Sequence, residues 1–135
     1  MIAQIDTLFT DSFSPIQLIE KAKTGLLKQS ADELATKFSI TDREMGRLLN
    51  ISERTYHRYK PETRLDMLVS ERLMLLNKLF MQGINVFENI DKFNRWLHRP
   101  LQSLGDNTPI SLLDTSTGFR LVEDTLTQIE YGIYA

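Results

Sequence analysis

The chain has 135 residues, of which 41% are hydrophobic and 25% charged, a composition typical of one ordinary globular domain or two small ones. The net charge of -2 argues against a general polyanion binder, and the absence of cysteine excludes disulfides and thiolate chemistry. No apolar run reaches the roughly 18 residues of a membrane span, and the first residues lack signal-peptide features, so we expect a cytoplasmic protein.

Charge is unevenly distributed along the chain. Residues 37–60 hold six basic and three acidic side chains, whereas residues 101–135 hold one basic and five acidic side chains. This contrast predicts two surfaces with different partners.

Helix start and stop signals recur along the whole chain and predict an all-α fold. Ser14-Pro15, Ser30 to Glu33, Thr41 to Glu44, Ser52 and Thr108-Pro109 each resemble a helix N-terminus. Gly25, Pro61 and Gly132 stand where helices are expected to end. The remaining helices are expected over residues 66–82, 90–98 and 116–131.

The helix expected over residues 66–82 has two apolar faces. Its larger face, expected to be core, contains Leu65, Leu68, Val69, Leu73, Leu75, Leu76, Leu79 and Phe80. Met67, Met74 and Met81 form a stripe on the opposite side. Methionines of this kind usually fill a core, but their position here makes them candidates for the interface of a homodimer.

Residues 42–60, DREMGRLLNISERTYHRYK, have the pattern of a helix-turn-helix. Gly46 is small where the second helix crosses the first, and Asn50 tolerates the left-handed backbone of the turn. Met45, Leu49, Ile51, Tyr56 and Tyr59 take the buried positions.

The outward side chains of the second helix are candidates for DNA binding in the major groove. Arg54 and Arg58 suit guanine or phosphate, and Ser52 and Thr55 suit phosphate. His57 can contact a base or simply face solvent, and Glu53 would repel phosphate. The alternative is a helical hairpin whose charged face is only solvated. These candidates are Ser52, Arg54, Thr55, His57 and Arg58.

No catalytic constellation is present, and we expect neither an enzyme nor a cofactor. Two histidines without cysteines do not make a metal site.

The second half of the chain carries a more specific pattern. It contains SERLMLLNKLF from residue 70 and FNRWLHRPLQSLGDNTPISLLDTSTGFRLVEDTLTQIEYG from residue 93. Together with the preceding helix-turn-helix, this stretch resembles the Xre/MbcA/ParS antitoxins from about residue 25 onward. Some members of that family have a basic pair where this chain has His57-Arg58.

The resemblance implies a bacterial type II antitoxin. Such proteins neutralise a RES-type toxin, which consumes NAD⁺, or a related ADP-ribosylating toxin, and they usually repress their own operon. We expect a helix-turn-helix region with an N-terminal helix over residues 1–64 and a toxin-binding, dimerising region over residues 65–135. An alternative is a transcription regulator whose second half only dimerises or senses a ligand.

By position, the resemblance places toxin contacts on Trp96, Leu113, Thr115, Gly118, Tyr131, Gly132, Ile133, Tyr134 and Ala135. Structural alternatives exist for the first four: Trp96 and Leu113 suit a core, Thr115 a helix cap, and Gly118 a close approach. The last helix is expected to place Phe119, Val122, Leu126 and Ile129 on its core face. The apolar end of the chain after Gly132 suits a partner better than solvent.

Overall fold

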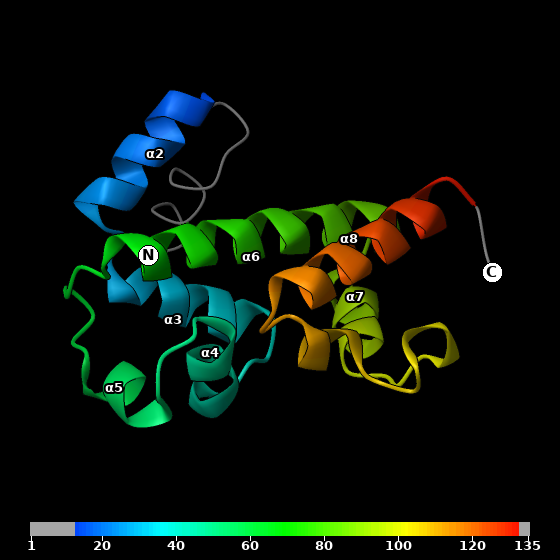
Figure 1. Ribbon diagram of the computed structural model, residues 1–135. Helices are drawn as coiled ribbons and strands as arrows, with labels where there is room; N and C mark the ends of the chain where they lie inside the picture. The colour runs from blue at the N-terminus through cyan, green and yellow to red at the C-terminus, as the bar shows by residue number, and fades with distance from the viewer. Residues whose placement is uncertain (1–12, 133–135) are drawn as a thin grey trace. The chain divides into compact units, whose positions relative to one another are not determined.

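The computed structural model describes residues 13–132, and every regular element in that range is a helix (Figure 1). The α-helices are α2 (Pro15–Thr24), α3 (Lys28–Lys37), α4 (Asp42–Leu48), α5 (Glu53–Arg58), α6 (Met67–Phe87), α7 (Ile90–Leu97) and α8 (Ser116–Glu130). Two short 3₁₀ helices, η1 (Gln102–Leu104) and η2 (Pro109–Leu112), lie between α7 and α8. The all-α prediction is confirmed. Within the described range, no helix has the length and hydropathy needed to cross a membrane.

The chain forms two compact units, residues 1–78 and residues 79–135. The division falls inside α6, which therefore supplies core residues to both units. The boundary proposed after residue 64 lies just before this helix.

Most of the helix starts read from the sequence are present. Ser14 forms a capping box with Gln17, while Thr41, Ser52 and Thr115 each accept a hydrogen bond from the amide three residues on. α2 ends at Gly25, which has a positive φ of 95°. A side chain there would meet the Leu65 carbonyl oxygen, so Gly25 lets two distant backbone segments approach.

The capping box predicted at Ser30 is wrong. α3 begins at Lys28, and Ser30 is a buried residue of its first turn. The amides of Lys28 and Gln29 donate instead to the carbonyls of Thr63 and Pro61. Because these tertiary bonds satisfy the free amides of the helix end, no side-chain cap is needed.

A buried hydroxyl joins three segments of the first unit. Ser70 Oγ accepts from the Leu26 amide at 2.9 Å and donates to the Leu65 carbonyl at 3.1 Å. The Leu65 amide in turn donates to the Leu26 carbonyl. Ser70 therefore holds the loop before α3 against the start of α6 and turns its own side of α6 inward.

The orientation of α6 differs from the prediction. Ser70 and Asn77, two turns apart, are buried, whereas Leu68 and Leu75 are 70% and 44% exposed. The prediction that Leu68 and Leu75 belong to the core is wrong, because the bonds of Ser70 rotate the buried face toward the polar residues. The helix also continues beyond Gln82, to Phe87.

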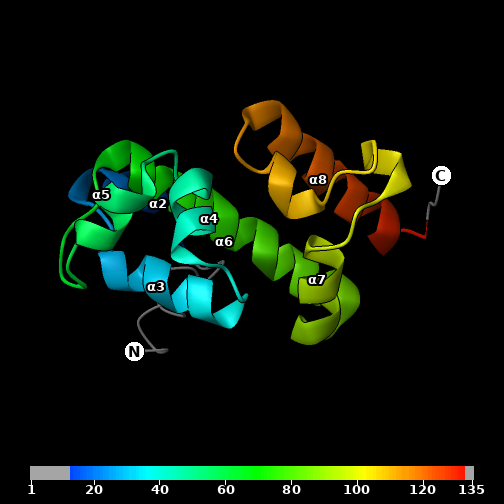
Figure 2. The same ribbon diagram turned by 90° about the horizontal axis from the view of Figure 1, so that it is seen from below.

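The helix-turn-helix is anchored by a polar cluster between α3 and α5. Figures 1 and 2 show α3, α4 and α5 grouped together. The Tyr56 hydroxyl donates to Asp32 Oδ1 at 2.6 Å, and Lys28 Nζ lies 3.1 Å from the same oxygen and 4.6 Å from the centre of the Tyr56 ring. Burial, reinforced by the Asp32 carboxylate, raises the pKa of Tyr56 well above its usual range. This cluster positions α5 through its inner face and leaves the outer face open.

Four aromatic rings form the core of the second unit. Phe93 contacts Phe80 edge-on with ring centroids 5.8 Å apart and stacks on Trp96 at 6.1 Å, while Phe87 lies 5.5 Å from Trp96. The Phe93 ring occupies the place of a side chain at Gly83, where a Cβ would overlap ring atoms. Glycine inside this helix is therefore required by packing.

We predict that Gly83→Ala destabilises the protein by about 1–3 kcal/mol, because the added methyl overlaps a ring that other rings hold in place. Helix propensity alone would stabilise the variant by about 1 kcal/mol. Asn85→Ala, on the exposed side of the same helix, is the control for propensity. Denaturant unfolding measures both variants, and a Gly83→Ala protein as stable as its parent would contradict the packing account.

A second prediction concerns pH. Because the pKa of Tyr56 is higher in the folded chain, the unfolded chain binds fewer protons above about pH 10, and stability falls as pH rises through that range. Tyr56→Phe should cost about 1–2 kcal/mol at pH 7, where the bond to Asp32 is intact. Its deficit relative to the parent should shrink above pH 10. Tyr131→Phe, at an exposed site, should leave stability unchanged, and a deficit for Tyr56→Phe that does not vary with pH would contradict the assignment.

Candidate functional site

The turn between α4 and α5 has the geometry expected of a helix-turn-helix. Asn50 has a positive φ of 61°, and a Cβ on Gly46 would come within 3.0 Å of the Ile51 carbonyl oxygen. Met45, Leu49 and Tyr56 are buried, while Ile51 and Tyr59 are only half-buried. The turn thus sets α5 across α4 with one face packed and one face exposed.

The outer face of α5 carries the residues proposed for DNA. Ser52, Arg54, His57 and Arg58 are exposed and Thr55 is half-buried. Within the described range, neither Arg54 nor Arg58 forms an ion pair or a hydrogen bond, so both guanidinium groups are available to a partner. Arg72 is used differently: its Nε donates to the Leu48 carbonyl at 2.8 Å and stabilises the end of α4.

The remaining candidates on α5 have partners of their own. Ser52 Oγ accepts from the Thr55 amide at 3.0 Å and donates to Thr55 Oγ1 at 2.8 Å, so these two hydroxyls first serve as the cap of α5. His57 Nδ1 lies 2.9 Å from Asp42 Oδ2 in the first turn of α4. This contact orients the imidazole and leaves its other nitrogen for a ligand.

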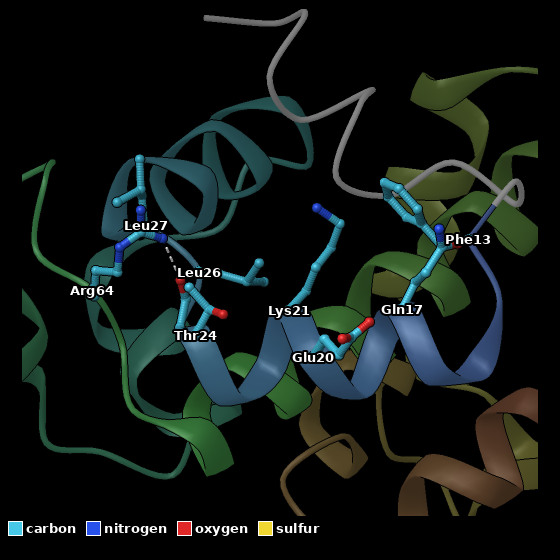
Figure 3. Close-up of a pocket in the computed structure, with 9 residues that line it drawn as sticks. Phe13, Gln17, Glu20, Lys21, Thr24, Leu26, Leu27 and Arg64 are labelled. Atoms are coloured by element: carbon cyan, nitrogen blue, oxygen red, sulfur yellow. Dashed lines mark hydrogen bonds between the residues drawn. The ribbon is translucent and has the colours of Figure 1, made fainter.

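A pocket of about 560 Å³ lies beside α2 and is lined by Phe13, Gln17, Glu20, Lys21, Thr24, Gly25, Leu26, Leu27 and Arg64 (Figure 3). Lys21 Nζ lies over the Phe13 ring, and Arg64 Nη1 donates to the Gly25 carbonyl at 2.8 Å. Both cations that line the pocket thus already have partners. Within the described residues, no cluster of three or more His, Asp and Glu side chains is arranged to hold a metal.

The candidate toxin contacts before α8 have structural roles. Trp96 and Leu113 are buried, Trp96 within the aromatic cluster. Thr115 Oγ1 accepts from the Gly118 amide at 3.0 Å as the cap of α8. A Cβ on Gly118 would overlap the Leu112 carbonyl oxygen, so this position accepts only glycine without rearrangement. These four residues build the domain, and their direct contact with a toxin stays a prediction.

The end of α8 presents the tail. The helix ends at Glu130; Tyr131 is 73% exposed, and Gly132 has a positive φ of 69° with open space around it. Ile129 is half-buried, so it is only partly in the core. Ile133, Tyr134 and Ala135 lie outside the described residues.

Other apolar residues of α6 and α8 also keep exposed surface. Met67 is 47% exposed, and Met74 and Met81 are half-buried. Leu121 on α8 is 44% exposed and was missed by the sequence reasoning. The available signal was its position: it lies off the stripe of Phe119, Val122 and Leu126, all of which are buried.

Comparison with known proteins matches both units. Residues 17–78 match the antitoxin Xre-like helix-turn-helix domain, and residues 82–132 match the antitoxin Xre/MbcA/ParS C-terminal toxin-binding domain.

Curated proteins that match over most of their length are also antitoxins. The chain is 30% identical to the Prs ADP-ribosylating antitoxin of Sphingobium sp. (strain YBL2) over 90% of its own length and 83% of that protein. It is 27% identical to the antitoxin Xre of Yersinia enterocolitica, over 87% of its own length and 81% of that protein. The helix-turn-helix prediction is confirmed, and the chain is a binding protein and not an enzyme. It belongs to the Xre/MbcA/ParS family of type II antitoxins, which bind their toxins through the C-terminal domain.

Proposed function

We propose that this antitoxin neutralises a toxin that consumes NAD⁺, either by ADP-ribosylation or by the RES-type reaction. The supporting observation is the similarity, over most of both chains, to an antitoxin whose name refers to ADP-ribosylation. The family binds its toxins through the C-terminal domain, which supports neutralisation by direct occupation of the toxin.

The exposed end of α8 supports a capping role for the tail. Tyr131 lies at the helix end with most of its surface in solvent, and Gly132 beside it has open space where a side chain would stand. An aromatic, apolar segment of this kind suits insertion into the mouth of an NAD⁺ site, which excludes the substrate sterically.

A chain ending at Glu130 tests this role. When it is co-expressed with the toxin encoded beside the antitoxin gene, we predict loss of protection and a fall in cellular NAD⁺, because the toxin's entrance is no longer covered. Cellular NAD⁺ and colony counts are the measurements, with the full chain as the control. Full protection by the shortened chain would remove the tail from the mechanism.

We further propose that the chain binds operator DNA through α5 and represses its own operon. Arg54 and Arg58 are exposed without partners in the described range, and the surrounding segment carries a net positive charge. The packing of Tyr56 against Asp32 holds the helix rigidly by its inner side, which suits insertion of the outer side into a major groove.

Dimerisation is part of this proposal, since two helix-turn-helix units read half-sites about 34–36 Å apart. Met67, Met74 and Met81 keep exposed surface on α6 and are the proposed dimer contacts. In the operator-binding experiment described next, we expect two chains to bind each DNA duplex.

Arg54→Ala and Arg58→Ala should each weaken operator binding by about 1–3 kcal/mol, because each removes a cation from the outer face of α5. Each change should also reduce the salt dependence of log K by about one if its contact is to phosphate. Arg120→Ala, an exposed arginine of the other unit, is the matched control. Fluorescence anisotropy over a salt series measures the affinity, and unchanged binding by both α5 variants would exclude them from the interface.

A further inference from the structure

One side of α8 is exposed along its whole length. Thr117, Leu121, Asp124, Gln128 and Tyr131 are all exposed, and their spacing of four, three, four and three residues places them on one stripe. The core residues Phe119, Val122 and Leu126 lie on the other side of the helix. We call these five residues the outer stripe of α8.

The outer stripe is unusual in its apolar content. Within residues 79–132, the large hydrophobic side chains that are exposed are Leu121 and Tyr131, at 44% and 73%, and both belong to this stripe. A single exposed leucine needs no explanation, but two large apolar side chains aligned on one helix face indicate a binding surface. Asp124 and Gln128 lie between them and add an acceptor and a donor.

The location of the stripe indicates its partner. It lies within the domain matched as toxin-binding, and it ends at Tyr131, the first residue of the proposed capping tail. Of the five acidic side chains in residues 101–135, Asp124 lies on the stripe, which favours a partner with a basic side chain beside its apolar centre.

We propose that the outer stripe is the helical part of the toxin-binding surface, with Leu121 as its apolar anchor in a recess of the toxin bordered by basic side chains. This assignment rests on the proposed function. It adds to the proposed role of the tail a helical surface that supplies affinity for the toxin.

The test is the affinity of the full chain for the purified toxin encoded beside its gene, made inactive by mutation. Leu121→Glu should weaken binding by about tenfold or more, as loss of a central anchor does. Leu75→Glu is the matched control, because Leu75 is also 44% exposed on a helix but lies outside the toxin-binding domain; its affinity should stay within about twofold. Asp124→Lys should also weaken binding, and more so at low salt.

Circular dichroism and thermal melting check that each variant folds. If Leu121→Glu does not fold, the toxin affinity of Asp124→Lys tests the proposed surface. Binding within about twofold of the parent by Leu121→Glu and Asp124→Lys would overturn the assignment. It would also be overturned if Leu121→Glu abolished self-association but not toxin binding, since the stripe would then meet a second copy. NAD⁺ consumption is measured separately with the unmutated toxin. If that toxin consumes no NAD⁺ although the inactive form binds the stripe, the proposed toxin class would be overturned and the proposed surface supported.

Discussion

The approach of the Leu112 carbonyl to Gly118 sets the architecture of the toxin-binding domain. Because no side chain stands at Gly118, η2 can end directly against the first turn of α8 while Thr115 caps that turn. This fixes the start of α8 and therefore the direction in which each of its residues points. Phe119, Val122 and Leu126 turn inward, and Leu121 is left outside. Gly118 thus has a structural role in the domain, because it determines which residues of α8 are exposed.

The helix-turn-helix unit follows the same logic with polar groups. Ser70 ties the loop before α3 to the start of α6, and Tyr56 ties α5 to Asp32 on α3. Both hydroxyls are buried and both are hydrogen-bonded, so each stabilises the fold where an unpaired group would cost energy. The inner side of α5 makes the anchoring contacts, and its outer side, with Arg54 and Arg58, stays exposed to a ligand.

Local signals in the sequence were sufficient to predict where most of the helices begin. They were not sufficient to predict which residues of each helix are buried. Ser14, Thr41, Ser52 and Thr115 cap helices as expected, because a cap depends on residues close in sequence. Ser30 does not, since the amides near it find carbonyls about thirty residues away. Likewise, the exposure of Leu68 and Leu75 follows from a hydrogen bond between Ser70 and Leu26, which helical periodicity does not reveal.

The sequence likewise predicts some features of the candidate sites and not others. The outward residues of α5 could be predicted, because a short amphipathic helix with a known buried side has only one exposed side. The hydrogen bond between Tyr56 and Asp32 joins residues 24 positions apart, so no pattern of neighbouring residues predicts it. The resemblance places toxin contacts at Trp96 and Leu113, and the burial of both residues agrees with the alternative of a core role.

Amide hydrogen exchange of the free antitoxin and of its complex with the toxin tests the central claim, that the two units serve different partners. We expect slower exchange over α8 and the residues after it when toxin binds, with α5 unchanged. Protection of α5 by the toxin, or unchanged exchange over α8, would contradict it.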